Sequence, residues 1–216
     1  MELGSLRRAL ADAGRALAWA VRERVAAEMA HLHSLKIVHR DLKSDNCLCD
    51  ADLNTKIADF GTAKLVQGSK GRDAAADDAE DAGAGDETTA ETAFSAPGVG
   101  QPGTATMTRG TGTPLWMAPE VFAGGSRYGP EVDVYSYGVI MWELLTRQQP
   151  WDELEATQYI EFYAALCDAL EAGRRPAVAP ADAEAHPQYV AMMAKCWAGD
   201  PRARPTFEMV SFGLAL

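Results

Sequence analysis

The stretch Val38-His39-Arg40-Asp41-Leu42-Lys43-Ser44-Asp45-Asn46 decides how this chain is interpreted, because one short polar loop holds acids, bases and an amide. Thirteen residues after Asn46 comes a second short motif, Asp59-Phe60-Gly61. The residue pattern of the flanking segments predicts the helices and strands that hold these two motifs. The motifs themselves indicate the functional residues.

Two short β-like runs lie between the motifs, Cys47-Leu48-Cys49 and Lys56-Ile57-Ala58, and the turn-rich segment 50–54 separates them. They predict a β-hairpin. Such a hairpin would bring Asn46 and Asp59 together from opposite sides despite their separation in sequence. Because a hard cation takes carboxylate and amide oxygens as ligands, this arrangement predicts a Mg²⁺ site.

The two motifs match H-R-D-L-x-x-x-N and D-F-G in order, and a series of further matches follows them along the chain. On these residues the chain resembles the eukaryotic protein kinases. Lys43 resembles the serine/threonine type, and the Trp-Met form of the segment 112–120 resembles the tyrosine-kinase-like group of that type. The later matches are Ala118-Pro119-Glu120, Asp133, Trp142-Glu143 and Arg204.

The resemblance implies a role for each residue of the two motifs. Asp41, with Arg40 beside it, would accept or orient the proton of a substrate hydroxyl, and Lys43 would contact the transferring phosphate of ATP. Asn46 and Asp59 would hold Mg²⁺ against the nucleotide. The resemblance thus implies ATP and Mg²⁺ as cofactors and protein Ser/Thr hydroxyls as acceptors.

Other matched positions are implied to bind the peptide or to support the site. Thr113 would contact the peptide substrate, and Asp133 would hold the backbone of the catalytic loop from below. Arg204 and Glu120 would form an ion pair. The remaining structural positions are His39, Phe60 and Gly61.

The fold expectation is a mainly α-helical lobe like the C-terminal lobe of protein kinases, with a short β-hairpin at the catalytic loop. Apolar spacing predicts a helix over 15–34, a buried central helix over 131–146, a helix over about 153–171 and a further helix reaching Trp197. The domain organisation is 1–67, a low-complexity insert over 68–107 and 108–216.

The insert 68–107 carries eight acids against two bases and few large apolar residues, so we expect it to be disordered. By resemblance it lies in the activation segment. A kinase acting upstream could phosphorylate a threonine at its exit, which would then pair with Arg40; plain linker threonines are the alternative. The candidate threonines are Thr104, Thr106, Thr108 and Thr111.

No glycine-rich loop or strand lysine of the kinase type precedes the first helical pattern. The resemblance therefore implies that the β-rich N-terminal lobe is missing and that the domain is truncated. Without that lobe adenine would be stacked on one face only. We expect weak nucleotide affinity and little or no phosphoryl transfer by this polypeptide alone.

The composition of the chain disfavours several other classes of protein. A net charge of −11 without a basic cluster disfavours nucleic-acid binding, and no apolar run is long enough to span a bilayer. Four cysteines are too few for a disulfide framework, and their spacing fits no zinc pattern. We interpret the chain as intracellular, with a cytoplasmic or nuclear location. We assign a structural role, packing or capping, to His31 and His33.

Three functions remain. A small acidic regulatory protein unrelated to kinases would require the whole motif series to be accidental, and the other two follow from the resemblance. The first is a serine/threonine kinase that transfers the γ-phosphate of ATP to protein hydroxyls, present here as a truncated domain. The alternative is a catalytically inactive, pseudokinase-like lobe that acts as a scaffold through its helices or its acidic insert. The full set Asp41, Lys43, Asn46 and Asp59 favours the first, and the missing upstream elements favour the second.

Overall fold

The protein is described here from a computed structural model, which describes residues 2–12, 14, 20–66, 113–122, 129–154, 156 and 158–215. The expected disordered insert 68–107 lies outside these residues. So do the four candidate phosphorylation sites, Thr104, Thr106, Thr108 and Thr111. Those expectations therefore stay predictions.

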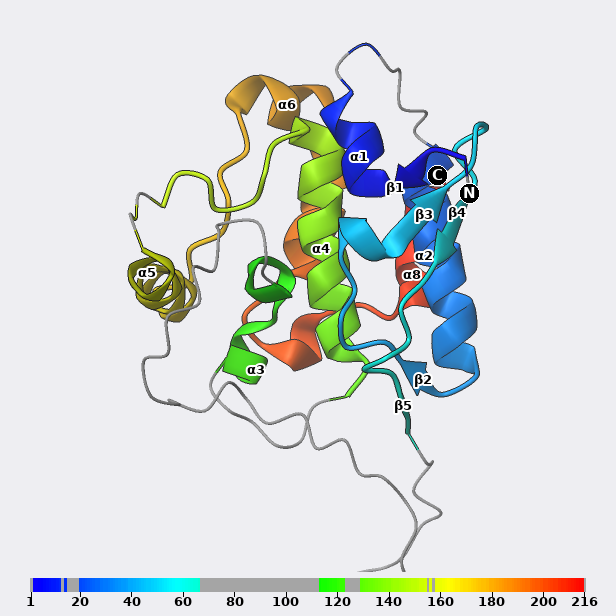
Figure 1. Ribbon diagram of the computed structural model, residues 1–216, viewed down its shortest axis with the longest axis horizontal. Helices are drawn as coiled ribbons and strands as arrows, with labels where there is room; N and C mark the ends of the chain where they lie inside the picture. Colours follow the sequence, from blue (N-terminus) through cyan, green and yellow to red (C-terminus); the bar gives the residue numbers. More distant parts are fainter. Residues whose placement is uncertain are drawn as a thin grey trace, which may run out of the picture.

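The described residues form a helix-rich fold with short strands, arranged around one central helix (Figure 1). This agrees with the expected mainly α-helical, kinase-like class. In chain order the elements are β1 (Gly4–Ser5), α1 (Leu6–Ala11), α2 (Ala20–Ser34), β2 (Ile37–Val38), η1 (Ser44–Asn46), β3 (Cys47–Cys49), β4 (Thr55–Ile57), β5 (Lys64–Leu65), η2 (Thr113–Trp116), α3 (Pro119–Phe122), α4 (Glu131–Thr146), α5 (Tyr159–Glu171), α6 (Pro180–Ala185), α7 (Pro187–Cys196), η3 (Pro201–Ala203) and α8 (Phe207–Leu214).

The central helix is α4, and its bounds are those that the apolar pattern predicts. Every residue from Val132 to Leu144 is buried, because neighbouring elements cover α4 on all sides. Gly138 allows the closest approach: a Cβ at this position would lie 3.0 Å from the Cβ and the backbone nitrogen of Trp197. The helix ends where Arg147 adopts a left-handed conformation (φ 58°).

The expected hairpin is formed by β3 and β4, which pair antiparallel with Cys47 opposite Ile57 and Cys49 opposite Thr55. The second strand begins one residue earlier than predicted. Its turn is ordered by Asp50, whose Oδ1 accepts hydrogen bonds from the backbone N–H groups of Asp52 and Asn54.

Two further pairings were not predicted from the sequence. The strand β1 pairs with the free edge of β3, and β2 pairs antiparallel with β5. The strands β1, β2 and β5 have only two residues each, which is too short for an alternating apolar pattern to show in the sequence. The β2–β5 pairing joins the segment before the first motif to the segment after the second.

One helix boundary differs from its prediction. The helix expected from about 153 begins at Tyr159, because Gln158 and Glu161 form a capping box there, and Trp151 enters a turn with positive φ (63°). The helix α2 begins at Ala20, and residues 15–19 of the expected 15–34 helix lie outside the described part.

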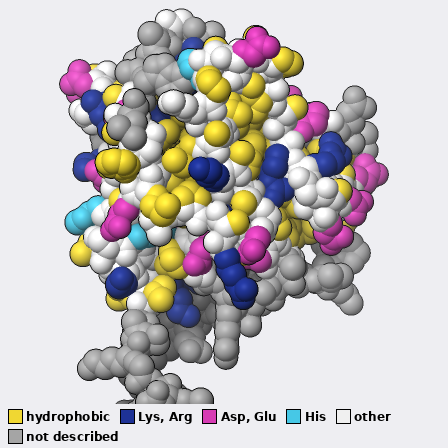
Figure 2. All heavy atoms as spheres, turned by 180° about the vertical axis from the view of Figure 1, so that it is seen from behind, with side chains coloured by type: hydrophobic (Ala, Val, Ile, Leu, Met, Phe, Trp, Pro, Cys, Tyr) yellow, Lys and Arg dark blue, Asp and Glu magenta, His cyan; other side chains and the backbone are white. Residues whose placement is uncertain are grey.

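The other helices pack around α4 on both of its sides. In Figure 1, α2 and α8 lie together on one side of α4, while α5 lies on the other. The face opposite that view shows hydrophobic side chains interspersed with Lys, Arg, Asp and Glu (Figure 2). Among the described residues, no helix combines the length and the apolar character needed to cross a membrane.

Candidate active site

The backbone of the loop that follows β2 is held by Asp133, near the start of α4. Its carboxylate is fully buried, and its two oxygens accept hydrogen bonds from the backbone N–H groups of His39 and Arg40, each at 2.8 Å. The ring Nε2 of His33 lies 2.9 Å from the same carboxylate. His33 therefore serves this anchor, in keeping with the structural interpretation of that histidine.

The Asp41 carboxylate lies in this loop and is held on one side only. Its Oδ2 accepts hydrogen bonds from Lys43 Nζ at 2.8 Å and from Asn46 Nδ2 at 3.1 Å. Its Oδ1 is buried and has no hydrogen-bond partner among the described residues. Leaving a buried acceptor unpaired costs about 1–3 kcal/mol, so this oxygen is positioned at a cost in stability.

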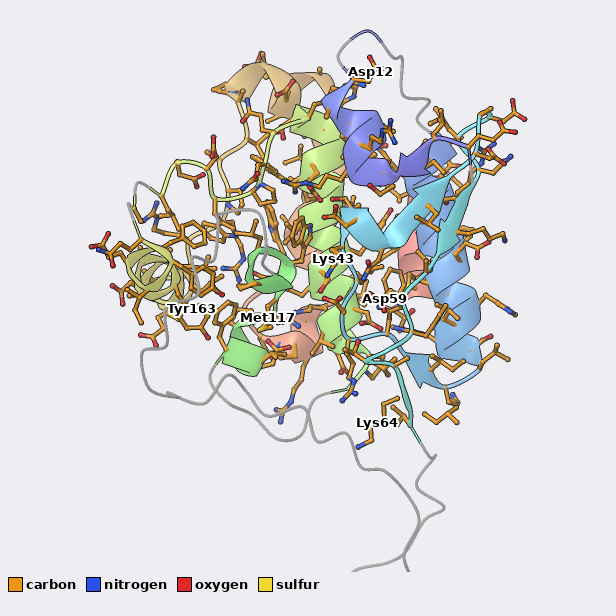
Figure 3. All side chains as sticks on the ribbon, viewed as in Figure 1. Asp12, Lys43, Asp59, Lys64, Met117 and Tyr163 are labelled. Atoms are coloured by element: carbon orange, nitrogen blue, oxygen red, sulfur yellow. The ribbon has the colours of Figure 1, made fainter. Side chains whose placement is uncertain are left out.

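The second motif runs directly beside the loop. The backbone N–H of Ala58 donates to Asn46 O at 2.9 Å, and Ala58 O accepts from His39 Nε2 at 3.0 Å. Asp59 follows at once, so the network brings Asn46 and Asp59 to one end of the hairpin, and Figure 3 shows Lys43 and Asp59 in the same region. The His39 and Phe60 rings meet edge to face, 5.3 Å apart.

The His39 side chain uses both ring nitrogens within the site. Its Nε2 donates to Ala58 O, while Nδ1 accepts from the backbone N–H of Asp41 at 3.3 Å. The hydrogen-bond network therefore assigns the ring hydrogen to Nε2. In this way one buried ring connects the catalytic loop to the segment that carries Asp59.

Two non-glycine residues of the site have left-handed backbone conformations, Arg40 (φ 66°) and Asp59 (φ 64°). Such conformations cost about 1–3 kcal/mol and persist where neighbours hold them. Arg40 is held through its N–H by Asp133 and through Nε by Thr62 O, and Thr62 Oγ1 donates to His39 O at 2.9 Å. Thr62 is a site residue that the sequence motifs did not single out.

Two oxygen groups near the end of the hairpin, the Asn46 amide and the Asp59 carboxylate, are of the kind that Mg²⁺ takes as ligands. Asn46 uses its Nδ2 to donate to two Asp41 oxygens, so its amide Oδ1 is the atom that it can offer to a cation. The Asp59 side chain is exposed. One amide and one carboxylate oxygen are hard ligands, and Mg²⁺ in such sites completes its octahedron with phosphate oxygens and water.

The segment expected to bind peptide lies on the other side of the loop. Thr113 begins η2, but its side chain is outside the described part of the chain. At the end of η2 the Trp116 side chain is buried, and its backbone carbonyl accepts from Ser136 Oγ at 2.8 Å. This bond attaches η2 to α4.

Glu120, in α3, forms a two-point ion pair with Arg204. Arg204 Nη1 donates to Oε1 at 2.6 Å and Nη2 donates to Oε2 at 2.8 Å. The Arg204 side chain is fully buried, and it also donates to the backbone carbonyls of Glu131 and Ala198. The pair joins parts of the chain that are 84 residues apart.

Sequence reasoning assigned no role to Glu143, which the structure places beside the loop. Burial raises the pKa of this carboxyl to about 7, although its hydrogen bonds from Trp116 and Ser44 act in the opposite direction. A signal was present in the sequence: an acid within an otherwise apolar buried helix needs polar partners.

The cysteines of β3 behave as buried apolar residues. Cys47 and Cys49 are both free thiols, and burial raises the pKa of each, to about 11 for Cys49. A thiol with a raised pKa is a poor nucleophile and metal ligand at neutral pH. This supports the structural interpretation of the Cys47-Leu48-Cys49 run.

Comparisons of the chain with a family model and with known proteins agree on one family. The chain matches the protein kinase domain over residues 2–211. It is 33% identical to the dual specificity protein kinase shkD of Dictyostelium discoideum, over 86% of this chain and 19% of that protein. It is 34% identical to the serine/threonine-protein kinase CTR1 of Arabidopsis thaliana, over 86% of this chain and 18% of that protein.

A further relative is the cyclic GMP-binding protein C of Dictyostelium discoideum, which is 31% identical over 96% of this chain and 7% of that protein. The chain thus spans less than a fifth of each of these three relatives. The match nevertheless includes both motifs, the peptide-side segment and the residues that anchor them to α4. The chain therefore belongs to the protein kinase domain family, with serine/threonine kinases among its relatives.

Proposed function

We propose that this chain provides the catalytic loop, the metal ligands and the peptide platform of a serine/threonine kinase. The reaction is transfer of the γ-phosphate of ATP to Ser or Thr hydroxyls of protein substrates. The observation that carries the proposal is Asp41: Oδ2 is held by Lys43 and Asn46, while the buried Oδ1 has no partner among the described residues. The carboxylate is thus fixed in one orientation, which a group that accepts a proton from a substrate hydroxyl requires.

Each residue of the site has a defined task in this reaction. The Asp41 carboxylate accepts the hydrogen bond of the substrate hydroxyl and orients it for attack, an assistance worth about 10²–10⁴ in rate. Lys43 holds Asp41 in place and brings a positive charge to the phosphate being transferred. Asn46 and Asp59 would hold Mg²⁺. ATP and Mg²⁺, when bound, supply the phosphoryl group and neutralise its charge.

The names of the relatives support protein hydroxyl groups as the acceptors of the phosphoryl group. One is named as a serine/threonine kinase and another as a dual specificity kinase, so hydroxyl groups of proteins are the acceptors that their names indicate. Because this chain spans a small part of each relative, its substrates and any upstream kinase that acts on it are part of the proposal.

The test is transfer of labelled phosphate from millimolar Mg·ATP to a generic basic protein. Asp41→Asn should abolish the transfer that the wild type gives. Asp45→Asn is the matched control, since Asp45 lies in the same loop with an exposed side chain, and it should retain transfer. Measurable transfer by the wild type that is equal in Asp41→Asn would overturn the role of Asp41.

A binding measurement tests the metal ligands separately from the chemistry. Calorimetric titration with Mg·ADP should detect binding by the wild type and none by Asp59→Asn. Asp52→Asn is the control, because Asp52 lies in the hairpin turn away from the site. Binding that is unchanged in Asp59→Asn, or that needs no Mg²⁺, would contradict the assignment of Asp59 as a metal ligand.

A further inference from the structure

The catalytic loop is attached to α4 at both of its ends. At its start, the N–H groups of His39 and Arg40 donate to Asp133. At its end, the fully buried Ser44 Oγ donates to Glu143 Oε1 at 2.8 Å. Asp41 and Lys43 lie between these two anchors. The position of the proposed base is therefore set from both sides by one helix.

The two anchors lie on different turns of α4. Asp133 and Glu143 are ten residues apart, which corresponds to about 15 Å along the helix axis. The two ends of the loop are therefore held at separate points of one rigid helix.

Glu143 also holds the peptide-side segment. Its second oxygen, Oε2, accepts a hydrogen bond from Trp116 Nε1 at 2.8 Å, and the Glu143 residue is only 2% exposed. One carboxylate therefore bonds the catalytic loop through one oxygen and η2 through the other. The catalytic loop, with Ser44, and η2, with Trp116, are far apart along the chain.

We propose that Glu143 is a positioning residue that sets the distance between the Asp41 base and the hydroxyl of a bound peptide, by joining Ser44 to Trp116. This inference rests on the proposed kinase function. It predicts that removing the charge of Glu143 impairs use of the peptide substrate while leaving use of the nucleotide unchanged, because the ligands assigned to Mg·ATP lie on Asn46 and Asp59.

The charge of Glu143 decides how strongly the catalytic loop and η2 are joined through its carboxylate. When ionised, each oxygen accepts a charge-assisted bond; when protonated, both bonds become neutral and weaker. Trp116 Nε1 can only donate, so the proton must lie on the Ser44 side and the Ser44 bond must reverse. The groups that influence this carboxyl are Arg7 from α1, Asp45 from η1 and the thiol of Cys47 from β3.

The variant Glu143→Gln tests this cleanly, because glutamine keeps the shape and can make both bonds without the charge. We expect kcat/KM for the peptide to fall about tenfold, the factor given by about 1.4 kcal/mol, with KM for ATP unchanged. Ser44→Ala should act in the same direction. Thr146→Val is the control, since it removes a hydrogen bond at the end of the same helix away from both loops.

The pH profile distinguishes positioning from general stability. The pKa of Glu143 is raised to about 7, so peptide kcat/KM of the wild type should rise through that region as the carboxyl ionises. Glu143→Gln should lack this rise. If Glu143→Gln matches Thr146→Val in kcat/KM and in pH profile, the inference is overturned.

A spectroscopic measurement separates this inference from the kinase proposal. The indole N–H resonance of Trp116, assigned with Trp116→Phe, should shift with pH around 7 in the wild type and stay constant in Glu143→Gln. A titrating resonance in a chain without transfer activity would support the junction at Glu143 and count against the kinase proposal. A Trp116 resonance that does not respond to pH between 5 and 9 would overturn the inference.

Discussion

Replacing Glu120 by glutamine should destabilise the fold strongly, because it removes the charge that compensates a buried guanidinium. The Arg204 side chain is fully buried and gives two of its donors to the Glu120 carboxylate. After the substitution, Arg204 would keep the carbonyls of Glu131 and Ala198 and the face of the Tyr135 ring, but no anion.

The magnitude follows from the burial of the two partners. Breaking one side of a buried ion pair costs about 3–5 kcal/mol, and we take the lower end because the Glu120 side chain is 24% exposed. For a domain of this size, about 3 kcal/mol corresponds to a fall in Tm of about 6–12 °C. Urea unfolding followed by circular dichroism measures the free energy, and thermal unfolding measures Tm.

The control is an exposed pair in the same protein. Lys56 and Glu28 form an ion pair at 2.6 Å, with side chains 65% and 32% exposed, so Glu28→Gln should cost no more than about 1 kcal/mol. Replacing both partners of the buried pair, Glu120→Leu with Arg204→Met, should recover much of the loss. The reasoning fails if Glu120→Gln destabilises the protein no more than Glu28→Gln does.

Three further predictions concern α4. Folding raises the pKa of Glu143 from 4.5 to about 7, so the folded state binds the proton more tightly and the free energy of unfolding should fall by about 3 kcal/mol as pH rises between these values. Urea unfolding at pH 5 and pH 8 checks this, and Glu143→Gln should flatten the dependence. Gly138→Ala should cost about 1–3 kcal/mol, because the new methyl group would meet the Trp197 backbone at 3.0 Å; an unchanged Tm would contradict this. Asp133→Asn leaves one acceptor oxygen for two loop N–H groups, so hydrogen exchange of the Arg40 amide should accelerate and phosphoryl transfer should fall. Exchange at the wild-type rate would show that the loop does not depend on this anchor.

Much of the site could be predicted from the sequence because its residues are close together in the chain. Asp41, Lys43 and Asn46 lie within six residues, so one loop conformation is enough to gather them. The hairpin that brings Ala58 and Asp59 to Asn46 is also local, and its turn is indicated by residues such as Asp50. Local geometry of this kind is visible as a pattern of residue types.

The anchors of the site could not be predicted in the same way, because they depend on pairs far apart in the chain. Ser44 and Glu143 are 99 residues apart, and Thr62 reaches back 23 residues to His39. The two-residue strands β1, β2 and β5 likewise exist only because a partner strand is present. Packing against distant residues decides such features, and no local pattern records them.

The sequence alone determined the protein kinase family of this chain, since the order and spacing of the carboxylates, the lysine and the amide are properties of the chain itself. It also determined the extent of α4, because a helix that is apolar on nearly every side has to be buried. Only the tertiary structure decided how that chemistry is held. The buried carboxylates of Asp133 and Glu143 acquire their hydrogen-bond donors when the chain folds, and an acid taken out of water is stable only where such donors surround it.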